Sequence, residues 1–591
     1  MKTALLLCLS ACLPWLSCCR SAGSDAAAAP GAIDWQTWSA AAFTKARAEH
    51  KLVLLDLGAE WCHWCHVMEG TTYADVGVRT LLATHYVAIE ADADRRLDLA
   101  TRYQDYGWPA TIVFDAEGRE LWKNRGYVPP PRMRAVLQKL VEEPVPIAAE
   151  DVAQTTELAN GLDAAVRATL LERMDALHDE QHGGFGFVHK YLDLAGVEWL
   201  LQRARGGSAV AKARVLRWLD AERALHDPVW GGAYQYSHGG VWENPHFEKV
   251  MVRQLADLRA YALAFGAFGR EPDLTAARGV ARYLTTMLQA PGGAFFASQD
   301  ADVVRGEHAA EYFALDDAGR RARGLPHIET SQWSRENGQA IQGLCALLAV
   351  APDAKLQRRV MEAATWIVAH RQRSDGLFAH GERDEGGPFL IDTLELVAAF
   401  AALHEVTMDR QWLDRALAGV HAIEARFGDA SRAGFATAIG DGVLPPVVDR
   451  NENVQLARVA NRVHHATGDA RARAIAERAL AAVVPATVAL QPGLPADLLL
   501  AAAELESEPT HVVVVGAVAD AAAAELFATA LRLAPGYRVV EWLVPGETGL
   551  GGAQYPVLQH AVAFVCANGA CSAPFESVAQ LRERLHASEP R

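Results

Sequence analysis

The stretch that decides the fold of the first part of the chain is Ala59-Glu-Trp-Cys-His-Trp-Cys-His66. It directly follows Lys51-Leu-Val-Leu-Leu-Asp-Leu-Gly58, a continuous apolar run that is typical of a buried strand and carries one carboxylate, Asp56. A Cys-x-x-Cys motif that opens a helix places Cys62 among unpaired N–H groups, which stabilise a thiolate. Cys65, one turn further on, can then resolve a mixed disulfide. The pattern predicts a redox-active pair in which Cys62 attacks.

Two further apolar runs support a thioredoxin-like domain over residues 33–141. Tyr86-Val-Ala-Ile-Glu90 predicts a second strand, and Pro109 begins a third that runs to Phe114. A Trp-Pro pair at the start of a strand is where thioredoxin-like folds keep a cis-proline beside the active sulfurs. Asp56 lies six residues before Cys62, where thioredoxins place the acid that relays the proton of the resolving thiol. We expect Pro109 to shape the substrate groove and His63 to favour the reduced pair.

Three other interpretations of this motif stay open. Cys62-His-Trp-Cys-His66 is also the attachment signature of c-type haem, although Met68 is too close to serve as the far axial ligand. A zinc site built from the two cysteines with His63 and His66 would be cramped. The pair can also form a structural disulfide. We expect neither a metal nor a cofactor.

From about residue 151 to 507 the chain is rich in Ala, Leu and Arg, with helical periodicity. About twelve amphipathic segments come in pairs, and the breaks between them repeat a glycine turn followed by an aromatic residue in most units. These turns are His182-Gly-Gly-Phe-Gly-Phe187, Trp230-Gly-Gly-Ala-Tyr-Gln-Tyr236, Gly292-Gly-Ala-Phe-Phe296, Asp375-Gly-Leu-Phe378 and Ala433-Gly-Phe435. Six helical hairpins predict an (α/α)6 toroid, with an open helical repeat as the alternative.

Polar residues follow these glycine turns, near the start of the second helix of a pair. In a toroid such helix ends converge on one mouth, so we expect one cavity there, with aromatic walls from Trp230, Tyr234, Tyr236 and Trp242. The cavity candidates are His246, Glu248, Asp300, Asp302, Asn337, Asp392 and Asn453. Paired carboxylates with aromatic residues bind sugars and cleave glycosidic bonds. Each of these residues can equally be a helix cap, and His246 a packing residue.

The tail, residues 510–591, alternates short apolar strands with helices and predicts a small α/β appendage. The fold class is therefore multidomain: an α/β thioredoxin-like domain, the toroid and this appendage. Cys566 and Cys571, with four residues between them near the end, form either a disulfide or a loosely held pair. The linker before the toroid contains Pro144 and Pro146, so we expect the first domain to dock on the toroid and the cavity to present a ligand to Cys62.

Residues 1–20 read as a signal peptide, with Lys2 before an apolar run and with small residues followed by cysteine that resemble a lipoprotein cleavage site. We therefore expect an exported protein, periplasmic or anchored to the bacterial envelope by lipid, with no other membrane contact. The 591 residues carry a formal net charge of −16 without a basic patch, which excludes nucleic acid as a partner. Hydrophobic residues make up 51%, enough for large cores.

Several motifs in one order resemble the spermatogenesis-associated protein 20 family. They are Trp61-Cys-His-Trp-Cys-His-Val-Met68, Gly107-Trp-Pro109, Gly183-Gly-Phe-Gly186, Pro245-His-Phe-Glu-Lys249, Ser298-Gln-Asp-Ala-Asp302 and Val565-Cys-Ala-Asn-Gly-Ala-Cys571. The resemblance implies a thioredoxin-like domain joined to a six-hairpin toroid similar to N-acylglucosamine 2-epimerases and glycosidases.

The sequence departs from the family pattern within the toroid, at Val188-His-Lys-Tyr-Leu192, Val252-Arg253 and Ser334-Arg-Glu-Asn-Gly338. The redox motif is intact. We therefore expect thiol–disulfide exchange on protein or small-molecule thiols, with the toroid as scaffold or ligand-binding cavity. The alternative is a carbohydrate-active enzyme, epimerase-like or glycosidase-like, that uses the toroid mouth and binds a sugar.

Overall fold

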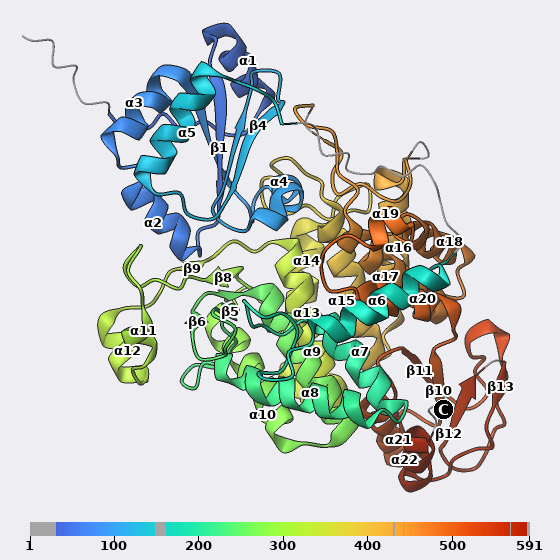
Figure 1. Cartoon of the computed structure of the whole chain (residues 1–591). Coiled ribbons are helices and arrows are strands. Elements are labelled where there is room, and N and C mark those ends of the chain that lie inside the picture. The colour runs from blue at the N-terminus through green and yellow to red at the C-terminus, as the bar shows by residue number, and fades with distance from the viewer. Residues whose placement is uncertain (1–30, 148–160, 430–431, 441, 568, 588–591) are drawn as a thin grey trace, which may run out of the picture.

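The computed structural model describes residues 31–147, 161–429, 432–440, 442–567 and 569–587. Figure 1 shows two α/β regions packed on a central ring of helices, so the predicted fold class is confirmed. The predicted signal peptide lies outside the described residues. None of the helices in the described ranges combines the length and the apolar character needed to cross a membrane.

The N-terminal domain is a four-stranded sheet in the order β2-β1-β3-β4, with β2 parallel to β1 and the other neighbours antiparallel. Its strands are β1 (Leu52–Gly58), β2 (Tyr86–Asp92), β3 (Ala110–Phe114) and β4 (Glu120–Arg125). Its helices are α1 (Ala40–Glu49), α2 (His63–Thr71), α3 (Val76–His85), α4 (Leu97–Tyr103), η1 (Gln104–Tyr106) and α5 (Pro130–Glu142). Side chains of α1 and α4 pack on one face of the sheet, and those of α2, α3 and α5 on the other.

The ring consists of six inner helices, each in contact with the next. In ring order the inner helices are α7 (Leu194–Arg205), α9 (Met251–Phe268), α13 (Ser334–Val350), α15 (Leu390–Thr407), α17 (Arg450–Thr467) and α20 (Ala496–Glu506). Their outer partners are α6 (Ala164–Leu177), α8 (Ala209–Glu222), α10 (Glu271–Tyr283), α14 (Ala354–Arg371), α16 (Arg410–Phe427) and α18 (Ala470–Ala481). Because α20 also contacts α7, the ring is closed, which excludes the open repeat.

Short elements fill the loops at the mouth and rim of the ring. The hairpin β5 (Tyr236–Ser237) with β6 (Pro245–His246) and the sheet β7 (Lys249–Val250), β8 (Ser298–Gln299), β9 (Ile328–Glu329) lie before and between inner helices. The others are η2 (Arg223–Leu225), η3 (Leu284–Leu288), α11 (Ala310–Phe313), α12 (Asp317–Arg323) and α19 (Ala486–Ala489).

The predicted glycine turns are held by buried ion pairs in the first two units. Lys190 is fully buried and donates to Asp179 at 2.6 Å, and Lys249 donates to Asp227 at 2.7 Å. Gly231 in the second turn has a φ of +79°, and a Cβ there would lie 2.2 Å from the carbonyl oxygen of Gly279. Only glycine fits at this turn, because the two backbone segments lie too close together for a side chain between them.

The tail forms a second four-stranded sheet in the order β11-β10-β12-β13, again with one parallel pair, β10 and β11. Its elements are β10 (Thr510–Val515), α21 (Ala521–Leu533), β11 (Arg538–Leu543), η4 (Leu550–Gly552), β12 (Val562–Ala567), β13 (Ala570–Cys571) and α22 (Val578–Ala587). Helix α21 packs on α9 and α13. Cys566 and Cys571 are paired across β12 and β13 and form a disulfide.

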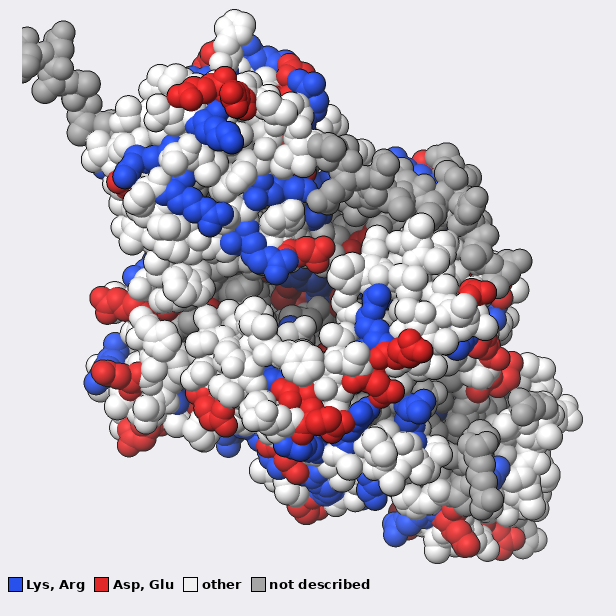
Figure 2. All heavy atoms as spheres, viewed as in Figure 1, with Lys and Arg blue, Asp and Glu red and all other residues white. Residues whose placement is uncertain are grey.

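The two sheets cover opposite ends of the ring. The N-terminal domain contacts the ends where the inner helices begin, for example through Gln104, which donates to Asp449 at 2.8 Å. The C-terminal domain contacts the ends where they finish, as Arg538 donates to Glu405 at 2.6 Å. Figure 2 shows charges of both signs interspersed on the visible face and a hollow where the N-terminal domain meets the toroid.

Candidate functional site: a disulfide between two domains

The two cysteines of the N-terminal domain lie where β1 passes into α2. Cys62 is the N-cap residue of α2, and its sulfur accepts a hydrogen bond from the backbone N–H of Cys65 at 3.1 Å. The two sulfurs form a disulfide, with 5.3 Å between the Cα atoms. The peptide bond between Trp108 and Pro109 is cis, and Trp108 packs beside the disulfide. In this state neither sulfur is free to bond to haem or zinc.

Asp56 lies on the face of β1 that is next to the resolving cysteine, Cys65. Two residues further along the strand, a Cβ on Gly58 would lie 3.2 Å from the Cys65 sulfur, so Asp56 shares that side of the sheet. The Oδ1 atom of Asp56 is buried without a hydrogen-bond partner among the described residues. Burial raises the pKa of Asp56 to about 7, a value suited to proton exchange near neutral pH.

The toroid holds both histidines of the motif through a single carboxylate. Asp302, in the loop after β8, accepts from His63 Nδ1 at 2.8 Å and from His66 Nδ1 at 3.0 Å. The other ring nitrogen of His66 faces the carbonyl oxygen of Glu60 at 3.0 Å, so both nitrogens meet acceptors and the ring carries a proton on each. The hydrogen bond to Asp302 likewise raises the pKa of His63. Asp302 therefore balances the charge that His63 brings to the pair.

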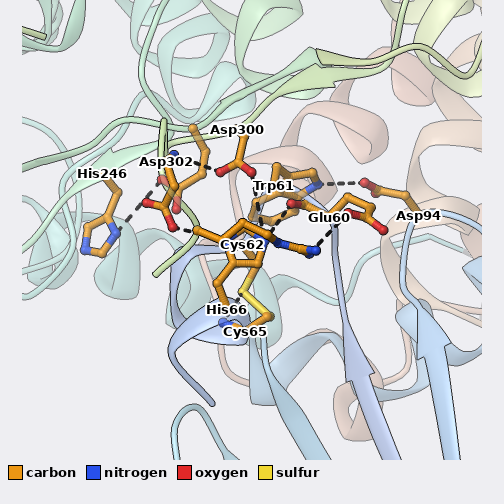
Figure 3. Close-up of a disulfide and its surroundings, with 11 residues drawn as sticks. Glu60, Trp61, Cys62, Cys65, His66, Asp94, His246, Asp300 and Asp302 are labelled. Carbon is orange, nitrogen blue, oxygen red and sulfur yellow. Dashed lines mark hydrogen bonds and ion pairs between the residues drawn. A yellow bond between two sulfur atoms is a disulfide. The ribbon is translucent and has the colours of Figure 1, made fainter. Parts of the chain in front are cut away.

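A second set of contacts holds the other side of the disulfide, and Figure 3 shows the one between Trp61 and Asp94. Trp61, next to Cys62, donates to Asp94 at 2.6 Å, and Arg335 at the start of α13 donates to the same carboxylate at 3.0 Å. His380 reaches the carbonyl oxygen of Asp94 at 2.7 Å while its other nitrogen faces Asp392 at 2.9 Å. Asp392 thus orients an interdomain contact.

Three more of the predicted residues lie beside α2. Glu248 is 3% exposed, and its Oε2 atom has no hydrogen-bond partner within the described part of the chain. Burial raises the pKa of Glu248 to about 7, and the backbone N–H of His63 opposes this shift. Burial also raises the pKa of Asp300 to about 6. His246 stacks on Tyr236 with 4.3 Å between ring centres, and burial lowers its pKa to about 4.

Asn337 and Asn453 hold turns instead of lining a site. The side chain of Asn337 accepts from the backbone N–H of Phe295 at 2.7 Å and donates to its carbonyl oxygen at 3.0 Å. Asn453 makes the same pair of bonds with Phe435 at 2.8 and 2.9 Å. Both asparagines fix the aromatic residue of a glycine turn.

The expectation of one cavity lined by these residues is corrected. A cavity of about 1340 Å³ does run along the ring axis, but none of the seven candidates lines it. They lie above it, at the helix starts that the N-terminal domain covers. The predicted aromatic walls are also wrong for Trp230, Tyr234 and Trp242, which are buried in the toroid core.

The axial cavity is lined by side chains from further along the inner helices, which the sequence analysis missed. Glu198 of α7 accepts from Arg259 of α9 at 2.6 Å and from Arg458 of α17 at 2.7 Å. Arg253 stacks on Tyr191 near the end that faces the N-terminal domain, with 4.3 Å between its guanidinium and the ring centre. Arginine and glutamate on helices are common, so no local signal marked these residues.

Two groups in the described ranges bring metal-ligating atoms within 4.8 Å of one another: His66, Asp300 and Asp302, and Glu222, His226 and Asp257. In the first group both oxygens of Asp302 are already used by the two histidines and by the backbone N–H of Gly306. In the second group Tyr261 donates to Glu222 at 2.5 Å.

Parts of the chain are similar to known proteins. The family model Thioredox_DsbH, described as a protein of unknown function, DUF255, matches residues 25–160. The thiol:disulfide interchange protein DsbD of Ralstonia nicotianae is 42% identical over 80 residues, 13% of this chain and 13% of that protein. Among solved structures, the cellobiose 2-epimerase of Bacillus thermoamylovorans covers 53% of this chain and 86% of its own, with 11% identity and a TM-score of 0.40.

Human spermatogenesis-associated protein 20 is 27% identical over 313 residues, 46% of this chain and 39% of that protein. The mouse protein is 26% identical over 307 residues, with the same coverage. The chain therefore spans about two fifths of the length of these relatives. The resemblance to spermatogenesis-associated protein 20 is thus confirmed.

Proposed function

We propose that the protein catalyses thiol–disulfide exchange through Cys62 and Cys65, on thiols outside the cytoplasm. One observation carries the proposal: the Cys62 sulfur caps α2 and accepts from the Cys65 N–H, where a thiolate is stabilised by the helix terminus. In the reductive direction a thiolate attacks Cys62, the disulfide bond breaks, and the Cys65 thiolate takes up a proton. Asp56, buried on the same side, is positioned to relay it.

The names of the similar proteins support the same chemistry. The DsbD relative, which matches 80 residues of this chain, is named for thiol:disulfide interchange. We extend that activity to this chain because the Cys62–Cys65 pair and the buried acid Asp56 occur together in one domain.

The contacts do not favour the carbohydrate-active alternative. A glycosidase needs two carboxyl groups on either side of a space that admits a sugar. Here Asp302 is bonded to His63 and His66, and Glu248 lies against α2. We propose that the toroid serves as the scaffold that covers the redox pair.

Redox titration of the full chain tests the proposal. The protein is equilibrated in glutathione buffers from about −120 to −300 mV, and its free thiols are then alkylated. The reduced fraction of the Cys62 peptide is quantified by mass spectrometry. We expect a single two-electron transition that Cys65→Ser abolishes. Cys571→Ser, which removes the other disulfide, is the matched control and should leave the transition in place. A pair that stays oxidised or stays reduced across the whole range would contradict the proposal.

A further inference from the structure

The sulfur that a substrate must reach is covered. Cys62 is 4% exposed and packs with Ala59, Trp61 and Val250 in one buried cluster, which Cys65 and Trp108 join at its edge. Val250 belongs to the toroid, in β7, so the cover comes from another domain. Disulfide exchange requires the attacking sulfur to approach the attacked one along the axis of the bond that breaks. A bulky reactant has no such approach while the domains are docked.

The cover is fixed on both sides of the pair. Asp302 bonds to both motif histidines on one side, and Asp94 bonds to Arg335 and His380 on the other. These bonds involve charged groups that are largely buried, which are costly to break because each partner would be left uncompensated. Figure 3 shows Asp300 and Asp302 on the toroid side of Cys62, with Asp94 beyond Trp61. Docking is therefore the resting arrangement of this site.

We infer that the reactant of the Cys62–Cys65 disulfide is a low-molecular-weight thiol, because the docked toroid excludes a protein dithiol from the Cys62 sulfur. The inference rests on the proposed function and names its substrate class. It makes Asp302 a positioning residue, which acts through His63 and His66 and does not itself touch the sulfurs.

The reaction balances with two small thiols. The first thiolate attacks Cys62, so that a mixed disulfide forms and the Cys65 thiolate leaves and takes up a proton. The second thiolate attacks the sulfur of the bound small thiol, releases the small disulfide, and leaves the Cys62 thiolate to be protonated. Two electrons pass from the two thiols to the protein pair.

The test compares a small and a large reductant on the full chain. The oxidised protein is mixed with dithiothreitol or with a reduced thioredoxin, and reduction is followed by trapping and quantifying the Cys62 peptide. For an accessible disulfide the protein dithiol is the faster reductant. Here we expect its second-order rate constant to fall at least roughly tenfold below that of dithiothreitol.

The variant Asp302→Ala then tests whether the docked toroid is what keeps thioredoxin from the Cys62 sulfur. Without this carboxylate we expect the rate with thioredoxin to rise at least roughly tenfold, while the rate with dithiothreitol changes less than about threefold. Asp353→Ala is the matched control: Asp353 caps α14 through Lys355 and Leu356, on the outer layer of the ring, and should behave as the parent does. The wild-type comparison needs no variant and stands even where Asp302→Ala does not fold.

The outcomes separate the two proposals. Thioredoxin that reduces the parent protein as fast as dithiothreitol overturns the small-thiol inference and leaves the exchange function intact. A disulfide that neither reductant opens overturns the exchange function itself. An unchanged thioredoxin rate in folded Asp302→Ala shows that the docked toroid is not the block, and this too overturns the inference.

Discussion

The two α/β domains have separate sheets with the same strand order. They differ in the residues that follow the first strand of each sheet. Both have the order second, first, third and fourth strand, with the first two parallel. In the N-terminal domain β1 contains Asp56 and leads to the N-cap Cys62. In the C-terminal domain β10 reads Thr-His-Val-Val-Val-Val, and the N-cap of α21 is Asp520. The same strand order thus leads to a Cys-x-x-Cys disulfide at the helix start in one domain and to an aspartate cap in the other.

The disulfides show the same contrast. Cys62–Cys65 lies at a helix start beneath another domain, whereas Cys566–Cys571 joins two neighbouring strands and leaves Cys571 exposed. A thiolate is stabilised at the first location by the helix terminus, whereas at the second the Cys566 sulfur lies 3.9 Å from the hydroxyl of Tyr555. Position in the fold, and not the number of cysteines, therefore separates the two pairs.

The largest effect we expect is the loss of all exchange activity in Cys62→Ser. Cys571→Ser should retain the activity and lose about 2 kcal/mol of stability, because it opens only a short loop. Turnover of a small disulfide by reduced glutathione measures the first effect. Hydrogen exchange of the β12 amides, recorded as the temperature is raised, measures the loss of stability in the C-terminal domain. Equal loss of activity in both variants would remove the distinction between the domains.

Asp56→Asn makes β1 more like β10 and should stabilise the N-terminal domain at neutral pH. The folded-state pKa of Asp56 is raised to about 7 from 3.8, so the protein loses stability as pH rises from about 4 to 7, where the unfolded chain ionises first. The cost reaches about 4 kcal/mol above pH 7 and is absent below pH 4.

Hydrogen exchange of the β1 amides measures this difference. We expect slower exchange in Asp56→Asn than in the parent at pH 8, after correction for intrinsic rates, and equal opening free energies near pH 4. The exposed Asp34→Asn is the control and should show no difference. Slower exchange at both pH values would mean that ionisation of Asp56 is not the cause.

The smallest effect we expect concerns the toroid carboxyl beside α2. Above about pH 7 Glu248 is ionised, and its charge near the helix start opposes the Cys62 thiolate. His63, His246 and Asp300 face the same region. Glu248→Gln should therefore lower the pKa of the Cys62 thiol and raise its alkylation rate at a pH below that pKa by roughly two- to tenfold.

Iodoacetamide labelling of the reduced protein between pH 5 and 10, quantified on the Cys62 peptide, gives this pKa. Asp273→Asn is the matched control, because Asp273 is also buried in the toroid with a pKa raised by burial to about 6 but lies at the start of α10, away from the pair. A pKa that rises, or that shifts equally in both variants, contradicts the assignment to Glu248.

The parts of this architecture that depend on neighbouring residues were predictable from the sequence. The apolar run before Cys62 predicted β1, and the spacing of glycine turns predicted the ring of helical hairpins. Hydrophobic period and the spacing of turns can be recognised from a single sequence, because they depend only on residues close together in the chain. Of the predicted carboxylates, Glu248 lies just before the inner helix α9, whereas Asp302 lies in the loop after β8.

What these side chains contact was not predictable. The bond between His63 and Asp302 joins positions 239 apart, and that between Arg458 and Glu198 joins positions 260 apart. No periodicity spans such distances. Nothing in the sequence indicates that a toroid carboxyl, Glu248, lies against α2. The shared strand order of the two sheets was likewise hidden, since their sequences have no motif in common.

The covering of Cys62 by a later part of the chain has a consequence for synthesis. The N-terminal domain has its own core, so it can fold once it leaves the ribosome, whereas Asp302 follows His63 by 239 residues. At a synthesis rate of about 5–20 residues per second, about 10–50 s pass before that carboxylate exists. During this interval Cys62 and Cys65 are open to protein oxidants and reductants that the finished molecule excludes. Protein partners can therefore set the oxidation state of the pair only before the toroid forms, and afterwards the pair exchanges with small thiols alone.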